Sequence, residues 1–404
     1  MPIGLRAWDA SRVGPTDAPT VVLRSPRALR RLLGSPGELG LARAYVTGDL
    51  DIEGDPAEAL RLLWLVAARQ QSKKVVTPAA LVRLAVVAAR VGAIGRVPKP
   101  PDIEARVGGR LHSRRRDREV IAHHYDTSNA FYSLLLDPRM AYSCAYWTPE
   151  TENADLATAQ VAKFDLVCRK LGLAPGARLL DIGCGWGGLA IHAARHYGVR
   201  VVGVTLSKEQ LSLARSRAHV ARLSDVIDLR LADYRDLADD PFDAVCAIEM
   251  GEHVGAGNYP NFAALLRELV RPGGRVLVQQ MSRQGRHRGG GAFIERYVAP
   301  DMDMRPVGQT VDLLERAGLE VRDVQALREN YTRTINAWRD QLEHRWNDAV
   351  GLLGAQRARM WRMYLIGSAL AFEQGRMGVD QILAVRPGVF TDLPPADAPP
   401  HPQR

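Results

Sequence analysis

Residues 177–210 constrain the fold of this chain more than any other stretch. Their sequence, ARLLDIGCGWGGLAIHAARHYGVRVVGVTLSKEQ, contains an apolar strand that ends at Asp181, a turn with four glycines, a helix, a second strand and the start of another helix. Glycine adopts positive φ easily and lets a ligand approach the backbone closely. The order of elements predicts a βαβ unit of a doubly wound α/β sheet, in which ligands bind at the carboxyl ends of the strands.

The same stretch favours one class of ligand. The dinucleotide pattern G-x-G-x-x-G fits only at 183–188, with the bulky Trp186 inside it. The second strand ends in Thr205 and Leu206, whereas an NAD site has an acidic residue there for the ribose. The glycine spacing alone also allows NAD, FAD or a plain tight corner. Asp181 before the glycines and an Asp-Tyr pair after a third strand are typical of S-adenosylmethionine (SAM) methyltransferases.

Five motifs, taken in order along the chain, make a family resemblance specific. They are HHYDTSNAFYSLLLD, YSCAYW, LLDIGCGWGGLAIHAA, VTLSKEQ and EMGEHVG. They resemble the cyclopropane-fatty-acyl-phospholipid synthase family, which includes the mycolic acid cyclopropane synthases and the enzymes that make methylene-branched, tuberculostearate-type acyl chains. The resemblance extends from Ala44 to Pro387. It implies an α/β fold, with a doubly wound, Rossmann-like SAM methyltransferase sheet and a smaller, mainly helical N-terminal domain.

Composition limits the remaining classes. With 404 residues, 46% of them hydrophobic, the chain is long enough for two domains with buried cores. Its four cysteines have no C-x-x-C spacing, which argues against a zinc site or a disulfide framework and predicts a reducing compartment. The N-terminus lacks an apolar signal core, and no stretch of about 18 apolar residues is free of charge, so we expect a cytoplasmic protein without a spanning helix.

The net charge of +9 favours acidic partners, and we expect peripheral contact with the inner, anionic face of a membrane. An arginine-rich composition by itself is the alternative explanation. Aromatic residues make up only 6% and no nucleic-acid motif is present, so nucleic acid is not an expected partner. The basic loop over 282–291, with Arg283, Arg286 and Arg288, is a candidate for lipid phosphate, with plain solvation as the alternative.

The chain divides into four segments. Residues 1–100 are predicted to form a helical domain that contacts lipid, and 101–118 form a basic linker interrupted by proline. Residues 119–390 form the SAM-dependent methyltransferase domain. The proline-rich tail over 391–404 is predicted to be disordered.

Apolar periodicity places helices over 25–33 and 56–70, with a turn-rich segment over 42–55 between them. An apolar helix over 81–97 either lies on a membrane surface or packs on the second domain. In the methyltransferase domain we expect further strands over 228–231, 242–248, 275–280 and 319–326, an antiparallel last strand over 381–385, and helices over 260–270, 307–317, 331–346 and 361–376.

The resemblance maps a SAM site around the glycine turn. For Asp181 and Gly183 a plain strand-end turn is the alternative, and for Gln210 and Tyr234 it is ordinary packing. The residues assigned to the cofactor are Tyr125, Tyr142, Ser143, Asp181, Gly183, Gly185, Thr205, Leu206, Gln210, Asp233, Tyr234 and Ile248.

An unactivated alkene is a weak nucleophile, and its attack on the SAM methyl group leaves a carbocation one carbon away. The site therefore needs a base that removes a proton afterwards. The family holds a bicarbonate ion beside the reacting carbons, and the resemblance assigns catalytic contacts with this ion to Cys144, Glu252 and Tyr331. No metal is expected.

The fifth strand departs from the family pattern. Cyclopropane synthases have an H-T-I string there that supplies two further partners of the ion, and this chain has Gln279, Gln280 and Met281. The resemblance therefore adds Gln279 and Met281 to the assigned catalytic residues. Glutamine donates a hydrogen bond but does not titrate as histidine does. Direct proton loss from the new methyl group closes a cyclopropane, whereas a preceding hydride shift leaves an exocyclic methylene. The lost histidine favours the methylene product.

Other residues near these motifs have two explanations each. Tyr146, Trp147 and Tyr331 stabilise a cation through their aromatic faces or pack in the core. His253 is a general base or a hydrogen-bonded scaffold residue. No base accompanies Cys144 in the sequence, so its thiol is not expected to be a nucleophile.

The leading hypothesis is SAM-dependent transfer of a carbon to the cis double bond of an unsaturated phospholipid acyl chain, giving a 10-methylene or a cyclopropane product. The alternatives are a SAM methyltransferase for another small molecule and a non-catalytic, membrane-associated SAM-binding protein. A homo-oligomer, and a reductase that completes a methyl branch, are further partners compatible with the resemblance.

Overall fold

The chain forms two compact units. The first comprises Met1–Arg106, Gly291–Val298 and Trp346–Leu370, and the second comprises Val107–Gly290, Ala299–Arg345 and Ala371–Arg404. Two segments from the second half of the chain thus belong with the N-terminal unit. The computed structural model describes residues 2–70, 86, 89, 92–105, 108–125, 128–149, 153–285 and 289–388.

The first unit combines helices with a small sheet. The predicted helices over 25–33 and 56–70 are present as α1 and α3, but the four-stranded sheet was not predicted because its strands are too short to show an alternating pattern. In its described part the α-helices are α1 (Pro26–Gly34), α2 (Glu38–Val46), α3 (Pro56–Gln70), α13 (Trp346–Leu353) and most of α14 (Ala355–Glu373). The sheet order is β2 (Arg12–Val13), β1 (Gly4–Arg6), β3 (Thr20–Leu23), β4 (Leu50–Glu53).

The segment over 42–55 is the end of α2 followed by β4, so the prediction of a turn-rich segment is wrong. Tyr45 and Val46 are buried, and β4 pairs antiparallel to β3. Arg359 of α14 donates to the carbonyl oxygen of Tyr45 at 2.6 Å and pairs with Asp51 of β4 at 3.1 Å. These contacts explain why the distant segment over 346–370 packs with the N-terminal residues.

The second unit contains the predicted doubly wound sheet. Strands β5 to β9 run parallel, and β11 lies antiparallel between β9 and β10. The strand predicted over 242–248 matches β8, and the antiparallel last strand is present but begins at Gly378. The order is β10 (Glu320–Ala326), β11 (Gly378–Val385), β9 (Val270–Ser282), β8 (Phe242–Ile248), β5 (Arg178–Ile182), β6 (Arg200–Thr205), β7 (Ile227–Leu231).

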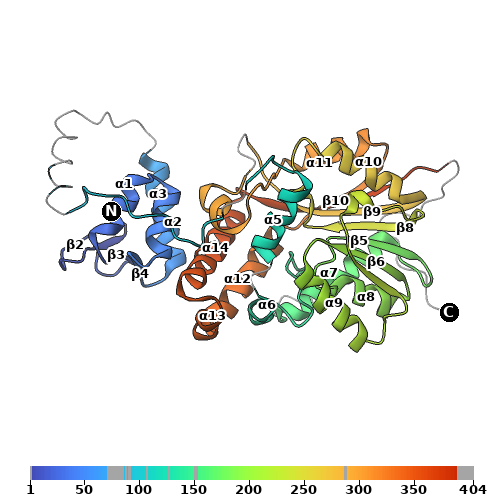
Figure 1. Ribbon diagram of the computed structural model, residues 1–404, viewed down its shortest axis with the longest axis horizontal. Helices are drawn as coiled ribbons and strands as arrows, with labels where there is room; N and C mark the ends of the chain where they lie inside the picture. Colours follow the sequence, from blue (N-terminus) through green and yellow to red (C-terminus); the bar gives the residue numbers. More distant parts are fainter. Residues whose placement is uncertain are drawn as a thin grey trace. The chain divides into compact units, whose positions relative to one another are not determined.

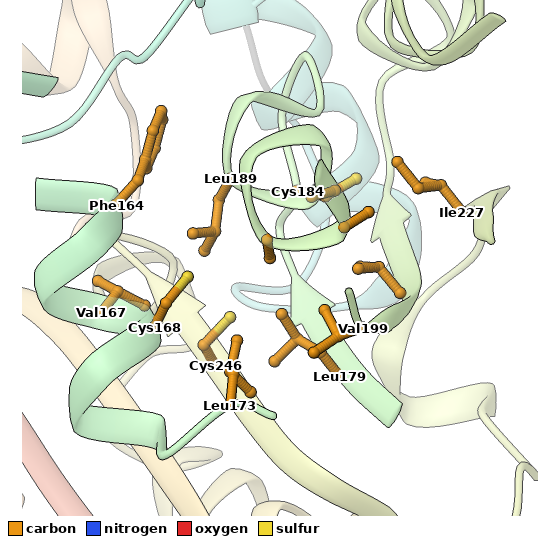
Figure 2. Close-up of a cluster of buried hydrophobic side chains, with 14 of the residues drawn as sticks. Phe164, Val167, Cys168, Leu173, Leu179, Cys184, Leu189, Val199, Ile227 and Cys246 are labelled. Atoms are coloured by element: carbon orange, nitrogen blue, oxygen red, sulfur yellow. The ribbon is translucent and has the colours of Figure 1, made fainter. Parts of the chain in front are cut away.

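Helices cover both faces of this sheet (Figure 1). On one face, α7 (Leu156–Leu171), α8 (Gly188–Tyr197) and α9 (Lys208–Val220) enclose an apolar core, of which Figure 2 shows part. On the other face, α10 (Tyr259–Leu269) and α11 (Val307–Arg316) enclose a second core. All four cysteines are buried and free. The remaining helices of this unit are α5 (Arg114–Tyr125), α6 (Asn129–Leu135) and α12 (Arg328–His344).

Among the described residues, no helix has the length and apolar character needed to cross a membrane. Nine residues of the helix predicted over 81–97, and the whole tail over 391–404, lie outside the described residues. Residues 92–97 are described and form turns and irregular structure, so the prediction that the helix continues to Val97 is wrong.

Candidate active site

A pocket opens at the carboxyl ends of β5, β6 and β8, where a doubly wound sheet binds its ligand. Most of the residues that we assigned to SAM line it. They are Tyr142, Ser143, Asp181, Gly183, Gly185, Thr205, Leu206, Gln210, Tyr234 and Ile248.

Two assigned residues, Asp233 and Tyr125, are not among these ten. Asp233 is not part of the lining: its carboxylate accepts from Arg235 Nη2 at 2.6 Å, and it caps the short 3-10 helix η2 (Tyr234–Asp236). Tyr125 ends α5, and its side chain lies outside the described residues.

The glycine turn after β5 adopts the backbone conformation that its sequence predicted. Gly183 has φ 80° and Gly185 has φ 53°, both in the left-handed region that favours glycine. A Cβ on Gly183 would lie 3.3 Å from Met250, whereas a Cβ on Gly185 would have no atom of the described residues within 4 Å. The turn therefore leaves open space beside Gly185, on the wall of the pocket.

The wall at the end of β6 is held by a short hydrogen-bond chain. Ser207 Oγ accepts from the backbone N–H of Gln210 and caps α9. Thr205 Oγ1 donates to Gln210 Oε1 at 2.8 Å. The Gln210 side chain is thereby fixed against the pocket, in place of the acidic residue of an NAD site.

Three of the five predicted catalytic residues converge on a carboxylate that was not predicted, that of Glu249. Its Oε1 accepts from the backbone N–H of Cys144 at 2.8 Å and from Gln279 Nε2 at 2.7 Å. Its Oε2 accepts from Tyr331 Oη at 2.5 Å. Gln279 is itself held by Gln381, whose Nε2 donates to Gln279 Oε1 at 2.9 Å. Glu249 also lines the pocket.

The backbone of Glu249 is as unusual as its surroundings. It has φ 52°, a conformation that is rare for a residue other than glycine and is typical of functional sites. Burial raises the pKa of the Glu249 carboxyl, and the bonds from Tyr331, Cys144 and Gln279 oppose that shift. The arrangement presents a hydrogen-bonded carboxylate to the pocket.

The other two predicted catalytic residues meet next to this cluster. The backbone N–H of Met281 donates to Glu252 Oε1, and Glu252 Oε2 is buried without a hydrogen-bond partner among the described residues. Glu252 lies in the short 3-10 helix η3 (Gly251–His253) and is 1% exposed. Burial, with the nearby charge of Glu249, raises its pKa to about 8.

This pKa predicts a pH-dependent stability. The Glu252 carboxyl binds its proton more tightly in the folded chain, so its contribution to stability is lost as the pH rises from 4.5 towards about 8. Glu252→Gln mimics the protonated form and should gain stability relative to the wild type over this window, by at most about 1.4 kcal/mol per pH unit. Thermal unfolding midpoints between about pH 5 and pH 8 test this. Equal pH dependence in both proteins would contradict it, and Glu268→Gln, at an exposed position, is the control.

The remaining candidates are placed as follows. The Cys144 thiol lies 3.2 Å from the carbonyl oxygen of Ala145, and burial raises its pKa well above the usual value, so it is not an activated nucleophile. His253 lines the pocket, and burial lowers its pKa to about 4, which keeps its ring neutral. Trp147 already has the guanidinium of Arg333 4.8 Å from its ring centre. Neither Trp147 nor Tyr146 is part of the pocket wall.

The basic loop after β9 is described only in part. Arg283 donates to the carbonyl oxygen of Gly289, within the loop itself. Residues 286–288, which include Arg286 and Arg288, lie outside the described residues.

Glu249, Lys163 and Gln381 are the site residues that sequence reasoning missed. Glu249 stands inside the quoted motif EMGEHVG, directly after β8, so its position at the ligand edge of the sheet was a usable signal. In the sequence, Lys163 looks like a surface lysine of a helix, and Gln381 looks like an ordinary strand residue. Only the folded chain shows that both are buried beside this site.

The sheet order, the glycine turn and the pocket define a SAM-dependent methyltransferase of the Rossmann-like class. The family model of mycolic acid cyclopropane synthetase matches residues 112–382. The chain is 40% identical to the probable fatty acid methyltransferase Rv3720 of Mycobacterium tuberculosis, over 95% of this chain and 91% of that protein. It is 33% identical to the tuberculostearic acid methyltransferase UfaA1 of the same organism, over 96% and 88%.

A solved structure agrees with these relatives. The mycolic acid cyclopropane synthase CmaA1, in complex with S-adenosylhomocysteine (SAH) and CTAB, superposes with a TM-score of 0.63 at 31% identity, over 66% of this chain and 98% of that chain. The chain therefore belongs to the mycolic acid cyclopropane synthetase family of SAM-dependent methyltransferases.

Proposed function

We propose that this chain transfers the methyl carbon of SAM to the cis double bond of an unsaturated phospholipid acyl chain, and that Glu249 takes up the proton lost afterwards. The observation that carries the proposal is the Glu249 carboxylate, which lies at the pocket wall and is oriented by Cys144, Gln279 and Tyr331. Close relatives named for fatty acid methylation support a lipid substrate.

The described residues fit SAM. The glycine turn leaves space for a ligand at Gly185, and Gln210 and Asp181 line the same wall. When bound, SAM supplies an electrophilic methyl group. The groups around it are largely apolar or hydrogen-bonded, which keeps water from competing with a weak alkene nucleophile.

The family resemblance calls for a bicarbonate ion as the base. In this chain the backbone N–H of Cys144, the Gln279 amide and the Tyr331 hydroxyl contact the Glu249 carboxylate. Glu249 supplies an anion with the same charge and the same oxygen acceptors as bicarbonate would. We therefore assign the base to Glu249 and derive no step through bicarbonate.

The reaction balances with Glu249 as the acceptor. The alkene forms a bond to the methyl carbon while the bond between that carbon and sulfur breaks, and the acyl chain becomes a carbocation. Loss of a proton from the new methyl group to Glu249 restores neutrality, either directly, which closes a cyclopropane, or after a hydride shift, which leaves a methylene. A reductase acting later would convert the methylene into a methyl branch.

We favour the methylene product because no titratable side chain replaces the histidine of the fifth strand. Gln279 is locked between Gln381 and Glu249 by its two amide ends. It orients the carboxylate but takes no proton. Gas chromatography with mass spectrometry of lipids from a host that expresses this chain, compared with an empty-vector host, tests the function. A new acyl chain with one added carbon supports the function, and unchanged lipids refute it.

Gln279→His should shift the product towards cyclopropane, since it places a titratable ring beside Glu249. We expect the ratio of cyclopropane to methylene chains to rise roughly tenfold, which corresponds to about 1.4 kcal/mol in relative barriers. The ratio is read from the same chromatograms. Gln309→His, at an exposed position of α11, is the control and should leave the ratio unchanged. An unchanged ratio in Gln279→His would remove the preference for the methylene product.

The substrate lies in a membrane, and the net charge of +9 favours contact with anionic phospholipid. We therefore propose a peripheral membrane protein. Co-sedimentation with anionic vesicles should weaken as salt is added, and salt-independent binding would argue against an electrostatic contact.

A further inference from the structure

Few charged side chains line the pocket, and only some of them are paired with a side chain of opposite charge. Asp117 pairs with Arg235 at 2.9 Å, and Arg235 also binds Asp233 outside the wall. The ring of His253 is neutral. Three lysine, aspartate and glutamate side chains of the wall are left that could face a charged ligand: Lys163, Asp181 and Glu249.

Lys163 is an unusual residue for the wall of a cofactor pocket. It projects from α7, is 2% exposed, and donates from Nζ to Ser143 Oγ at 2.9 Å, with Nζ 4.2 Å from the ring centre of Phe164. Among the described residues it forms no ion pair. An ammonium has three donors, and burying one without an anionic partner is costly.

Among the described residues, the carboxylates near Lys163 form no ion pair with it. Asp137, which attracts its charge, accepts from the backbone N–H groups of Arg139 and Ala141 at 3.0 Å each. Glu249 is held by its own three donors. Asp181 is 2% exposed and accepts from Cys246 Sγ at 3.6 Å. The ammonium of Lys163 thus has donor capacity for an anion that the described residues do not supply.

We propose that Lys163 binds the carboxylate of the methionine moiety of SAM. SAM carries a sulfonium, an ammonium and a carboxylate, and these match Glu249, Asp181 and Lys163 in sign, one for one. The three wall groups carry a net charge of −1 when ionised, which is opposite to the net charge of +1 on SAM. Only the placement of the sulfonium beside Glu249 rests on the proposed function; the role of Lys163 rests on its burial and its single hydrogen bond.

The test compares two ligands that differ in this carboxylate, SAM and decarboxylated SAM, by isothermal titration calorimetry without lipid. The wild type should prefer SAM by about 10- to 100-fold, the range of a hydrogen bond between charged groups. Lys163→Met, which keeps the apolar stem, should bind SAM about as weakly as decarboxylated SAM. Lys170→Met is the matched control, because Lys170 is a buried lysine of the same helix that pairs with Asp323 away from the pocket.

Two outcomes would overturn the proposal. One is a wild type that binds the two ligands within about threefold of each other, a result that needs no variant and so does not depend on its folding. The other is a Lys163→Met protein that keeps the preference. Since no lipid is present, a chain that discriminates the ligands but modifies no acyl chain would refute the proposed function and leave the role of Lys163 intact.

Discussion

Glu249→Gln should lower the rate of acyl-chain modification by at least about 100-fold, the usual contribution of a positioned general base. The amide keeps the size of the side chain, and its oxygen still accepts from Cys144 and Gln279. What it loses is the charge and the capacity to take up a proton. The measurement is turnover of labelled SAM with vesicles of unsaturated phospholipid, with Glu268→Gln as the control at an exposed position.

Binding and rescue separate this effect from misfolding. SAH lacks the sulfonium, so its affinity should stay within a few fold of the wild type in Glu249→Gln. In Glu249→Ala the space of the carboxylate is vacated while its three donors remain, and added bicarbonate should restore part of the activity. Full activity in Glu249→Gln, or equal dependence of the wild type and Glu249→Ala on bicarbonate, would contradict the assignment of the base.

Gly185→Val should abolish SAM binding, with an affinity loss of at least about 100-fold, that is about 2.7 kcal/mol. A Cβ at this position points into open space on the pocket wall, so a branched side chain would occupy the volume that a ligand needs. The φ of 53° also makes any side chain strained there. Calorimetric titration with SAM measures the effect.

Strain and steric exclusion can be told apart with a second glycine. Gly176 has φ 85°, is exposed, and likewise has no atom within 4 Å of an added Cβ, but it lies before β5 and outside the pocket. Gly176→Val should lower the unfolding midpoint about as much as Gly185→Val and leave SAM binding unchanged. Equal losses of binding in both variants would mean that backbone strain, not the filled pocket, is responsible.

The methyltransferase sheet was predictable because its signals are local. The glycine turn requires positive φ, and the strand over 242–248 is a largely apolar segment in which five of seven residues are buried in the structure. The small N-terminal sheet was not predictable, since strands such as Arg12–Val13 are too short to show a period. The return of residues 346–370 to the N-terminal unit depends on contacts such as Arg359 with Asp51, which only tertiary packing creates.

The site was predictable as a set of residues but not as an arrangement. The family resemblance identified Cys144, Gln279 and Tyr331, and in the structure all three donate hydrogen bonds to the carboxylate of Glu249. From the sequence we expected a bound ion at this place and not a side-chain carboxylate. The sequence does not reveal that Glu249, at the end of a strand, lies beside Tyr331, which is in a helix 82 positions later. The backbone of Glu249 is in the left-handed region, and no local sequence pattern predicts this conformation for a glutamate.

Transfer of a labelled carbon tests the central claim most directly. The purified chain is incubated with SAM that carries a fully deuterated methyl group and with vesicles of unsaturated phospholipid, and the released acyl chains are examined by mass spectrometry. We expect acyl chains that have gained the labelled carbon minus one deuteron, which the base has removed, and at least about 100-fold fewer of these chains with Glu249→Gln. Acyl chains without label from a protein that binds SAM, or label that retains every deuteron, would contradict the central claim.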